Sequence, residues 1–243
     1  MAISPHQGST GGGTAATITG TNLGGAIAVR FDGRTAVITA NTPTSVSVLT
    51  PSGTGVADVT VTTGGGTSSP QRFFYLPPPV VLSVSPASGP LVGGTTLTIT
   101  GRNLSTATSV AFGASTVTPT VVSDGEITVV APAGAAGVAS LVVTTRGGVY
   151  SGASFTYAAP PTATSFTPTT SVLAGGVLVS ITGTNLATTT GVTFGGTPTT
   201  FAVLSPTRVA AIAPTRGIAG AVQVALTTTG GSATAPGTFL YIL

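Results

Sequence analysis

A six-residue sequence occurs three times in this chain of 243 residues, as ITGTNL at 18–23, ITGRNL at 99–104 and ITGTNL at 181–186. The copies lie 81 and then 82 residues apart. A fixed period indicates tandem copies of one unit, and a unit of this length can hold its own core without a neighbour. The spacing therefore predicts a string of three domains, over residues 1–77, 78–158 and 159–243.

Other positions recur in phase with the six-residue sequence. Each copy has a proline seven residues before a Gly-Gly pair, a phenylalanine eight residues after the leucine, a second proline at a fixed offset, and a closing Phe-x-Tyr. The prolines are Pro5, Pro86, Pro168, Pro51, Pro132 and Pro214, and the closing pairs are Phe73/Tyr75, Phe155/Tyr157 and Phe239/Tyr241. The repeat thus extends over nearly the whole chain.

Each copy reads as short strands separated by turn residues. In the middle copy, TLTIT (96–100) alternates apolar and polar residues, as a half-buried strand does. We expect further strands at 80–86, 109–113, 116–122, 126–132, 139–145 and 153–157. Seven short strands with Gly and Pro between them indicate an all-β fold of three tandem immunoglobulin-like β-sandwiches.

The repeated residues fit the core and the turns of such a sandwich. Gly101 would take a backbone conformation that other residues resist, Asn103 would adopt the left-handed region, and Leu104 would fill the core. The phenol of Tyr157 could reach a backbone carbonyl at the edge of the sandwich. Across the three copies we assign this structural role to Gly20, Asn22, Leu23, Phe31, Tyr75, Gly101, Asn103, Leu104, Phe112, Tyr157, Gly183, Asn185, Leu186, Phe194 and Tyr241.

These motifs carry a resemblance to a known family. The stretch VSPASGPLVGGTTLTITGRNL, followed by VAFG and FTY within 84–157, resembles the IPT/TIG domain. The third copy is similar over 166–241, and the first has Phe31-Asp32-Gly33 in place of the Phe-Gly doublet. The resemblance implies the immunoglobulin-like module of plexins, some transcription factors, and bacterial surface and phage proteins. It implies no particular function.

The first copy differs from the others at its beginning. Only Met1–Ile3 precede Ser4-Pro5, whereas PVVLSV (79–84) and TATSF (162–166) precede the equivalent dipeptide in the other copies. We therefore expect a shortened first strand. Such a strand could leave a neighbouring edge open to another chain, although native edge strands are often short for no further reason. The joints YLPPPVV (75–81) and YAAPPTAT (157–164) favour extended, semi-rigid connections.

Composition excludes several classes of function. Charged residues are 5% of the chain, lysine and cysteine are absent, and the seven arginines are scattered, so the net charge of +3 forms no basic patch for nucleic acid. The beginning of the chain shows no signal-peptide pattern, and no apolar run is long enough to enter a membrane. We expect no cofactor and no metal site, since four carboxylates and the single His6 near the N-terminus provide neither a calcium cage nor a preorganised catalytic set.

Three functions remain, none of them enzymatic. The first is a self-associating structural protein, a building block of an extracellular filament or a phage-like or virion assembly, because a surface with so little charge is prone to associate. Its partners would be other copies of itself or other structural proteins, outside the cell, on its surface or in a virion. The alternative is a cell-surface adhesin or polysaccharide-binding rod with a surface glycan as partner. A DNA-binding module is the third, by analogy with the transcription-factor members.

Overall fold

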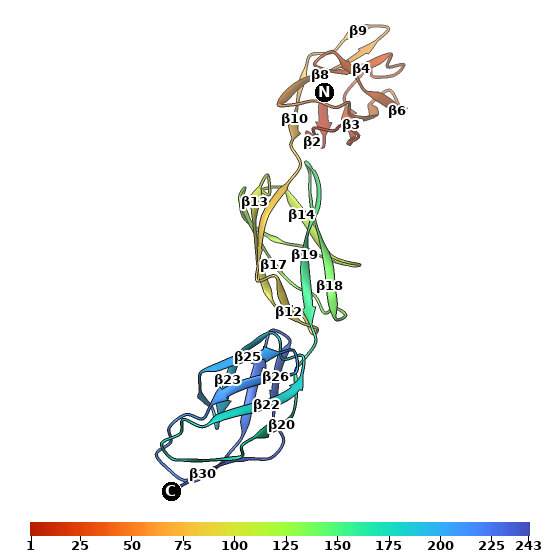
Figure 1. The fold of residues 1–243 in the computed structure, drawn as a ribbon. Coiled ribbons are helices and arrows are strands. Elements are labelled where there is room, and N and C mark those ends of the chain that lie inside the picture. Colours follow the sequence, from red (N-terminus) through yellow and green to blue (C-terminus); the bar gives the residue numbers. More distant parts are fainter. The chain divides into compact units, whose positions relative to one another are not determined.

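A computed structural model describes residues 1–243, and it contains strands without a helix. Figure 1 shows the chain as three groups of strands, which follow one another along the sequence from red through green to blue. Each group forms its own hydrogen-bonded sheets, and no sheet takes strands from two groups. The fold is therefore three tandem immunoglobulin-like modules, as the repeat predicted.

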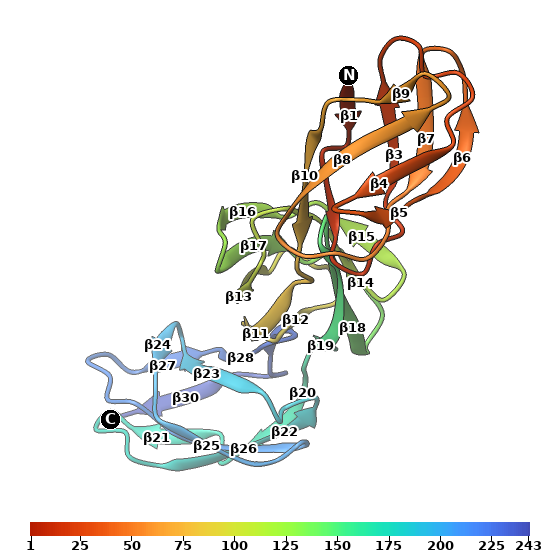
Figure 2. The ribbon, with the colours of Figure 1, turned by 90° about the horizontal axis from the view of Figure 1, so that it is seen from above.

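The first module consists of two facing sheets. The first sheet has the order β1-β3-β7-β6, and the second has the order β2-β10-β8-β4-β5 with β9 paired to β8. The strands are β1 (Ala2–Ser4), β2 (Gln7–Ser9), β3 (Ala15–Thr19), β4 (Ala28–Phe31), β5 (Arg34–Thr35), β6 (Val37–Asn41), β7 (Ser45–Leu49), β8 (Val56–Thr63), β9 (Gly66–Thr67) and β10 (Gln71–Leu76). Figure 2 shows these strands in red and orange.

The second module repeats this arrangement. Its first sheet has the order β11-β13-β17-β16, and its second the order β12-β19-β18-β14-β15. The strands are β11 (Val80–Ser85), β12 (Ser88–Pro90), β13 (Thr96–Arg102), β14 (Ala107–Phe112), β15 (Ser115–Val117), β16 (Thr120–Ser123), β17 (Glu126–Val130), β18 (Gly137–Thr145) and β19 (Gly148–Ala158).

The third module divides its second sheet in two. The first sheet has the order β20-β22-β26-β25, while the other strands form the sheets β21-β30-β27 and β24-β23-β28-β29. The strands are β20 (Thr162–Thr167), β21 (Thr170–Val172), β22 (Leu178–Thr184), β23 (Thr189–Phe194), β24 (Thr197–Pro198), β25 (Phe201–Ser205), β26 (Arg208–Ile212), β27 (Gly220–Val222), β28 (Val224–Thr228), β29 (Gly231–Thr234) and β30 (Phe239–Ile242).

The recurring first proline lies where the chain passes from one sheet to the other. The bonds Ser4-Pro5, Ser85-Pro86 and Thr167-Pro168 are cis. Before each of them the chain pairs antiparallel in the first sheet, as β1 does with β3. After each of them a three-residue strand runs parallel to the closing strand of the second sheet, as β12 does with β19. The opening segment of each module thus belongs to both sheets.

Alternate residues of the central strands fill each core. In β13, Leu97 and Ile99 are fully buried between more exposed threonines. In the first module the rings of Phe31 and Phe73 meet edge to face with centroids 5.2 Å apart, a favoured aromatic geometry. In the third module Phe194 and Phe239 repeat the contact at 5.0 Å. The apolar alternation in the sequence is therefore the inner face of each sheet.

Two details of the second module differ from the strands expected from sequence. The run 116–122 is two strands, β15 and β16, which lie in different sheets on either side of Pro119. Proline cannot donate to a ladder, so the chain changes sheets there. The short parallel strand β12 has no apolar alternation and was not expected. By Cα proximity alone the chain would divide into two units whose boundary crosses β11, β13, β17, β18 and β19, but hydrogen-bonded sheets do not divide there.

Candidate functional site

The structure holds no group of three His, Cys, Asp or Glu side chains that could bind a metal ion. His6 lies near the amino end, with its ring edge-on to Phe74 at 6.0 Å between centroids. The structure also contains no helix with the length and apolar character that spanning a bilayer requires. The features that recur between modules are turns, glycine contacts and apolar surfaces.

One carboxylate organises the motif loop of the second module. Asp124 precedes β17 and accepts a hydrogen bond of 2.8 Å from the Ser105 hydroxyl and one of 3.1 Å from the backbone N–H of Asn103. The Ser105 bond first, and then the backbone N–H, hold the pKa of Asp124 below its usual value. The carboxylate therefore acts as a local brace for this turn.

We predict that replacing Ser105 with alanine raises the pKa of Asp124 toward the ordinary value of an aspartate, because the largest cause of its lowering is removed. Because the folded pKa is the lower one, the brace stabilises the second module fully above the unfolded pKa. That contribution is lost as the pH falls through the folded pKa. A carboxyl-carbon NMR titration of wild type and Ser105→Ala measures the shift. Equal titration curves for the two proteins would show that the Ser105 bond does not form.

The asparagine and leucine of the repeated motif take the same positions in all modules. Asn22, Asn103 and Asn185 have φ angles of 59°, 59° and 58°, in the left-handed region. The leucines that follow them are buried, with exposed fractions of 4% for Leu23 and 0% for the others. The asparagine side chains do not bond their own backbone. The side-chain nitrogens of Asn103 and Asn185 donate instead to Pro78 O and Pro160 O, in the segments that lead into their modules.

The motif glycine is needed for a different reason from the one expected. Gly101 and Gly183 have no positive φ, so no unusual conformation requires them. A Cβ at Gly101 would overlap the carbonyl of Val80, and a Cβ at Gly183 would overlap that of Thr162. The glycine therefore permits the close approach of the entering strand. In the first module Gly20 has only Met1 and Leu23 nearby, at 3.5 Å.

At the other end of each module, the closing tyrosine bonds the second recurring proline. The phenol oxygens of Tyr75, Tyr157 and Tyr241 donate to the carbonyl oxygens of Pro51, Pro132 and Pro214, each at 2.8 Å. Burial raises the pKa of all three phenols.

The first glycine of each Gly-Gly pair contacts the backbone at the same recurring proline. Gly93, for instance, has a φ of 75° and is so close to Pro132 that a side chain would overlap its backbone. The recurring second proline, the Gly-Gly pair and the closing tyrosine are therefore parts of one contact.

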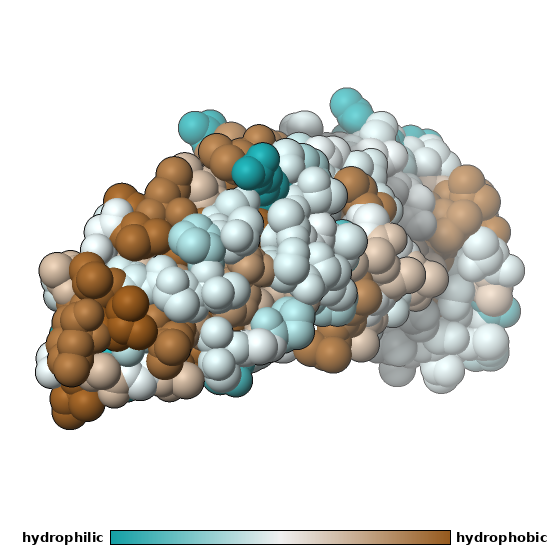
Figure 3. Space-filling view, turned by 60° about the horizontal axis from the view of Figure 1, so that its bottom comes forward, coloured by the Kyte–Doolittle hydropathy of each residue, from teal (hydrophilic) through white to brown (hydrophobic).

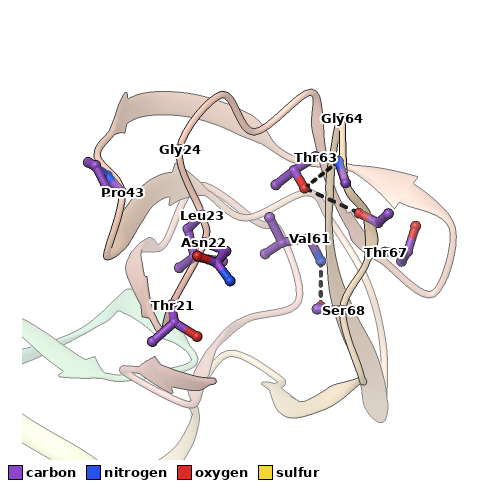
Figure 4. Close-up of a pocket in the computed structure, with 12 residues that line it drawn as sticks. Thr21, Asn22, Leu23, Gly24, Pro43, Val61, Thr63, Gly64, Thr67 and Ser68 are labelled. Carbon is purple, nitrogen blue, oxygen red and sulfur yellow. Dashed lines mark hydrogen bonds between the residues drawn. The ribbon is translucent and has the colours of Figure 1, made fainter.

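A groove of about 700 Å³ lies in the first module, between the motif loop and a glycine hairpin. The loop contributes Thr21–Gly24, and the hairpin between β8 and β9 contributes 63–68. Figure 4 shows the Asn22 side chain standing in the space between them, with the Thr63 hydroxyl hydrogen-bonded within the hairpin. The walls are backbone, hydroxyl and apolar groups without a charged residue.

The outer face of each first sheet carries aliphatic side chains. Leu49, Val130 and Ile212 occupy the same position in β7, β17 and β26, and their exposed fractions are 38%, 53% and 43%. The outer strands add Val37, Val122 and Leu204, which are also exposed. We call these six residues the aliphatic sheet face. Figure 3 shows brown apolar areas on a surface that is otherwise mostly pale, with few hydrophilic residues in teal.

In the third module this face is hollowed. A depression of about 200 Å³ is lined by Leu178, Thr200, Phe201, Ala202, Ala210 and Ile212. Leu178 and Ile212 are cross-strand partners, as are Ala202 and Ala210. The depression is therefore a built feature of β22, β26 and β25 that an apolar side chain of another molecule would fit.

The sequence model of the IPT/TIG domain matches the chain three times, over residues 1–75, 79–157 and 161–241. The chain belongs to the IPT/TIG domain family. Tandem IPT/TIG modules of the immunoglobulin-like type are typically non-catalytic. The family match covers the motif residues of every module, including the first, where the opening strand is short.

Relatives of this IPT/TIG chain include Fibrocystin-L of Mus musculus, which is 44% identical over 79 residues. The match covers 32% of this chain and 2% of that protein, so the chain spans only a small part of its relative's length. Among solved structures, the extracellular region of Plexin A4 has 20% identity and a TM-score of 0.49 over 99% of this chain and 24% of that one. The Escherichia coli adhesin FdeC has 14% identity and a TM-score of 0.36 over 99% and 96%.

Two of these features escaped the sequence-based assignment. The aliphatic sheet face could have been found, because a large aliphatic residue stands two positions before Pro51, Pro132 and Pro214 in every copy. Alternation from the buried residue before it places that side chain outward. The groove had no such signal, since its walls are glycine and hydroxyl residues that resemble any turn.

Proposed function

We propose that this chain is a non-catalytic structural protein whose IPT/TIG modules, with boundaries at 1–77, 78–158 and 159–243, associate with other copies. The assembly would be an extracellular filament or a virion-like layer. The aliphatic sheet face carries the proposal, because exposed aliphatic side chains recur on the first sheet of each module. Each aliphatic side chain that becomes buried contributes roughly 1.5–3 kcal/mol at most, so several together stabilise a complex.

The outer strands support association because they lack one common form of protection, which is charge. Natural edge strands are commonly guarded by charged residues, lysine above all. β6, β16 and β25 contain no charged residue and expose aliphatic side chains. Each of them has an irregular register with its partner strand, at Ile38/Ala40, Val121/Ser123 and Val203/Ser205. A bulge interrupts the straight ladder that an added strand would need, so side-chain packing is the mode of contact we propose.

The aromatic residues favour this function over glycan binding. Ten of the thirteen Phe and Tyr side chains are buried in the cores, and Phe74 alone is prominent at the surface with an exposed fraction of 39%. Sugar-binding surfaces commonly use exposed aromatic rings. An adhesin or polysaccharide-binding rod is therefore the second candidate. A clear hit of the whole chain on a glycan array, lost in Phe74→Ala, would support that candidate.

The test is the native mass of the chain across a concentration series, followed by negative-stain electron microscopy. We expect the mass to rise above the 23.3 kDa of one chain as the concentration increases. The triple variant Leu49→Ser, Val130→Ser and Ile212→Ser should remain a single chain, because it removes the apolar contact but keeps the strands.

The matched control is the triple variant Val56→Ser, Val138→Ser and Val149→Ser, which changes exposed valines in the second sheets of two modules. It should associate as the wild type does. A wild type that stays at the mass of one chain throughout the series contradicts the proposal.

A further inference from the structure

The second and third modules hold the segment that leads into them by a common set of contacts. Asn103 donates from its side-chain nitrogen to Pro78 O at 2.9 Å, and Asn185 donates to Pro160 O at 2.8 Å. In both cases the donor and the acceptor are 25 residues apart. The motif asparagine thus fixes the backbone of an extended, proline-containing segment.

A glycine-containing hairpin contacts the same entering segment from the opposite side. A Cβ at Gly147 would overlap the carbonyl of Pro77, and a Cβ at Gly230 would overlap that of Ala159. Both glycines follow a threonine whose hydroxyl accepts a hydrogen bond from the glycine N–H, at 3.1 Å in each hairpin. The entering segment therefore lies directly against this hairpin, where only a residue without a side chain fits.

The first module keeps the same residues without their partner. The Gly65 N–H donates the equivalent hydrogen bond to the Thr63 hydroxyl at 3.2 Å. A Cβ at Gly65 would meet only that hydroxyl, at 3.7 Å, and no carbonyl. The asparagine position is occupied by Asn22 with the same φ of 59°. Between Asn22 and the hairpin lies the groove of about 700 Å³ that Figure 4 shows.

The spacing identifies what would fill the groove. Val80 approaches Gly101 from 21 positions earlier, as Thr162 approaches Gly183. Counted from Gly20 and Asn22, the same separations lead to positions directly ahead of Met1. The opening strand agrees with this register, because β1 has three residues where β11 and β20 have six.

We propose that the groove of the first module is the seat of an extended, proline-containing segment joined to the amino end of β1. The segment would lie as Pro77–Pro78 and Ala159–Pro160 do ahead of β11 and β20. Its recognition is backbone-directed: Asn22 donates to one carbonyl, Gly20 and Gly65 allow the close approach of others, and the segment extends β1 along β3. The first module thereby keeps a binding position equivalent to those of the other two modules, independently of any contact through the aliphatic sheet face.

The experiment attaches a copy of the linker to the full chain. A duplicate of the six-residue segment 76–81 is placed directly before Met1, which puts the copied Pro78 25 positions ahead of Asn22. A control extension of the same length contains only Gly and Ser. Hydrogen exchange of the Asn22 side-chain amide and of the hairpin 63–68 is followed by NMR. We expect about tenfold slower exchange of the Asn22 amide with the linker copy, the effect of one net hydrogen bond, and none with the Gly-Ser control.

Two variants separate docking from a general change in stability. Asn22→Asp removes the donor but tolerates the left-handed backbone, so it should abolish the protection of the hairpin in the extended chain and leave the original chain unchanged. Gly65→Ala should behave in the same way, because its Cβ is harmless until a carbonyl lies against it. Equal exchange in the linker and Gly-Ser chains, or equal effects of the variants with and without the linker, would overturn the proposal.

Discussion

Replacing Gly101 with alanine is expected to destabilise the second module by about 3 kcal/mol, whereas the same change at Gly20 leaves the first module nearly unchanged. A Cβ at Gly101 would overlap the Val80 carbonyl, so β11 or β13 must move. At Gly20 the nearest atoms belong to Met1 and Leu23 at 3.5 Å, an ordinary contact. Alanine also lowers the entropy of the unfolded chain, which offsets about 0.4–1 kcal/mol of any loss.

Module-resolved hydrogen exchange by mass spectrometry measures this difference, because a single melting curve would combine three separate cores. Gly183→Ala is the matched control, since its Cβ would overlap Thr162 in the same way, and it should destabilise the third module as Gly101→Ala does the second. An equal loss at Gly20 would mean that the motif needs glycine for its own backbone rather than for the entering strand.

The sequence predicted the fold class because the pattern is carried by backbone and core. Alternating Leu97 and Ile99 specify an inner face, and the in-phase prolines and glycines specify the turns that separate the strands. These patterns involve residues that are close in sequence, and they recur in each copy. The strands of the second module were therefore placed to within a few residues at most positions.

The contacts between turns were harder to predict, because they join residues that are distant in sequence. Nothing local shows that Gly101 faces Val80, or that the Asn103 side chain reaches Pro78 rather than its own backbone. Both facts depend on how the entering segment crosses the module. The prediction of a single strand over 116–122 was wrong for a related reason. Thr-Val-Thr-Pro-Thr-Val-Val has a uniform β character, and only the proline shows where the chain leaves one sheet for the other.

The two candidate surfaces also differ in how far the sequence predicts them. The aliphatic sheet face follows from alternation, because each of its central residues directly follows a buried Val48, Val129 or Ala211. The proposed association through this face rests on the low charge of the chain, which the sequence shows directly. The groove of the first module has no such pattern, because Gly65 differs from Gly147 and Gly230 only in its three-dimensional neighbours.

Leu104→Ala should cause a large loss of stability in the second module. Leu104 is fully buried, and the truncation removes its burial and leaves a cavity in the second core, which costs about 2–5 kcal/mol. The loss should be confined to the second module, because each module has its own sheets. Leu186→Ala should do the same to the third module, where the leucine is part of the core cluster with Phe194 and Tyr241.

Chemical denaturation followed by module-resolved hydrogen exchange measures both variants. The control is Leu82→Ala in the same module, whose side chain has an exposed fraction of 67% and should cost within about 0.5 kcal/mol. Leu23→Ala in the first module provides a graded comparison, since Leu23 retains an exposed fraction of 4% beside the groove and a cavity there can open to water. If Leu104→Ala cost no more than Leu82→Ala, the motif leucine would not be the core residue that its burial indicates, and the repeated sequence would need another explanation.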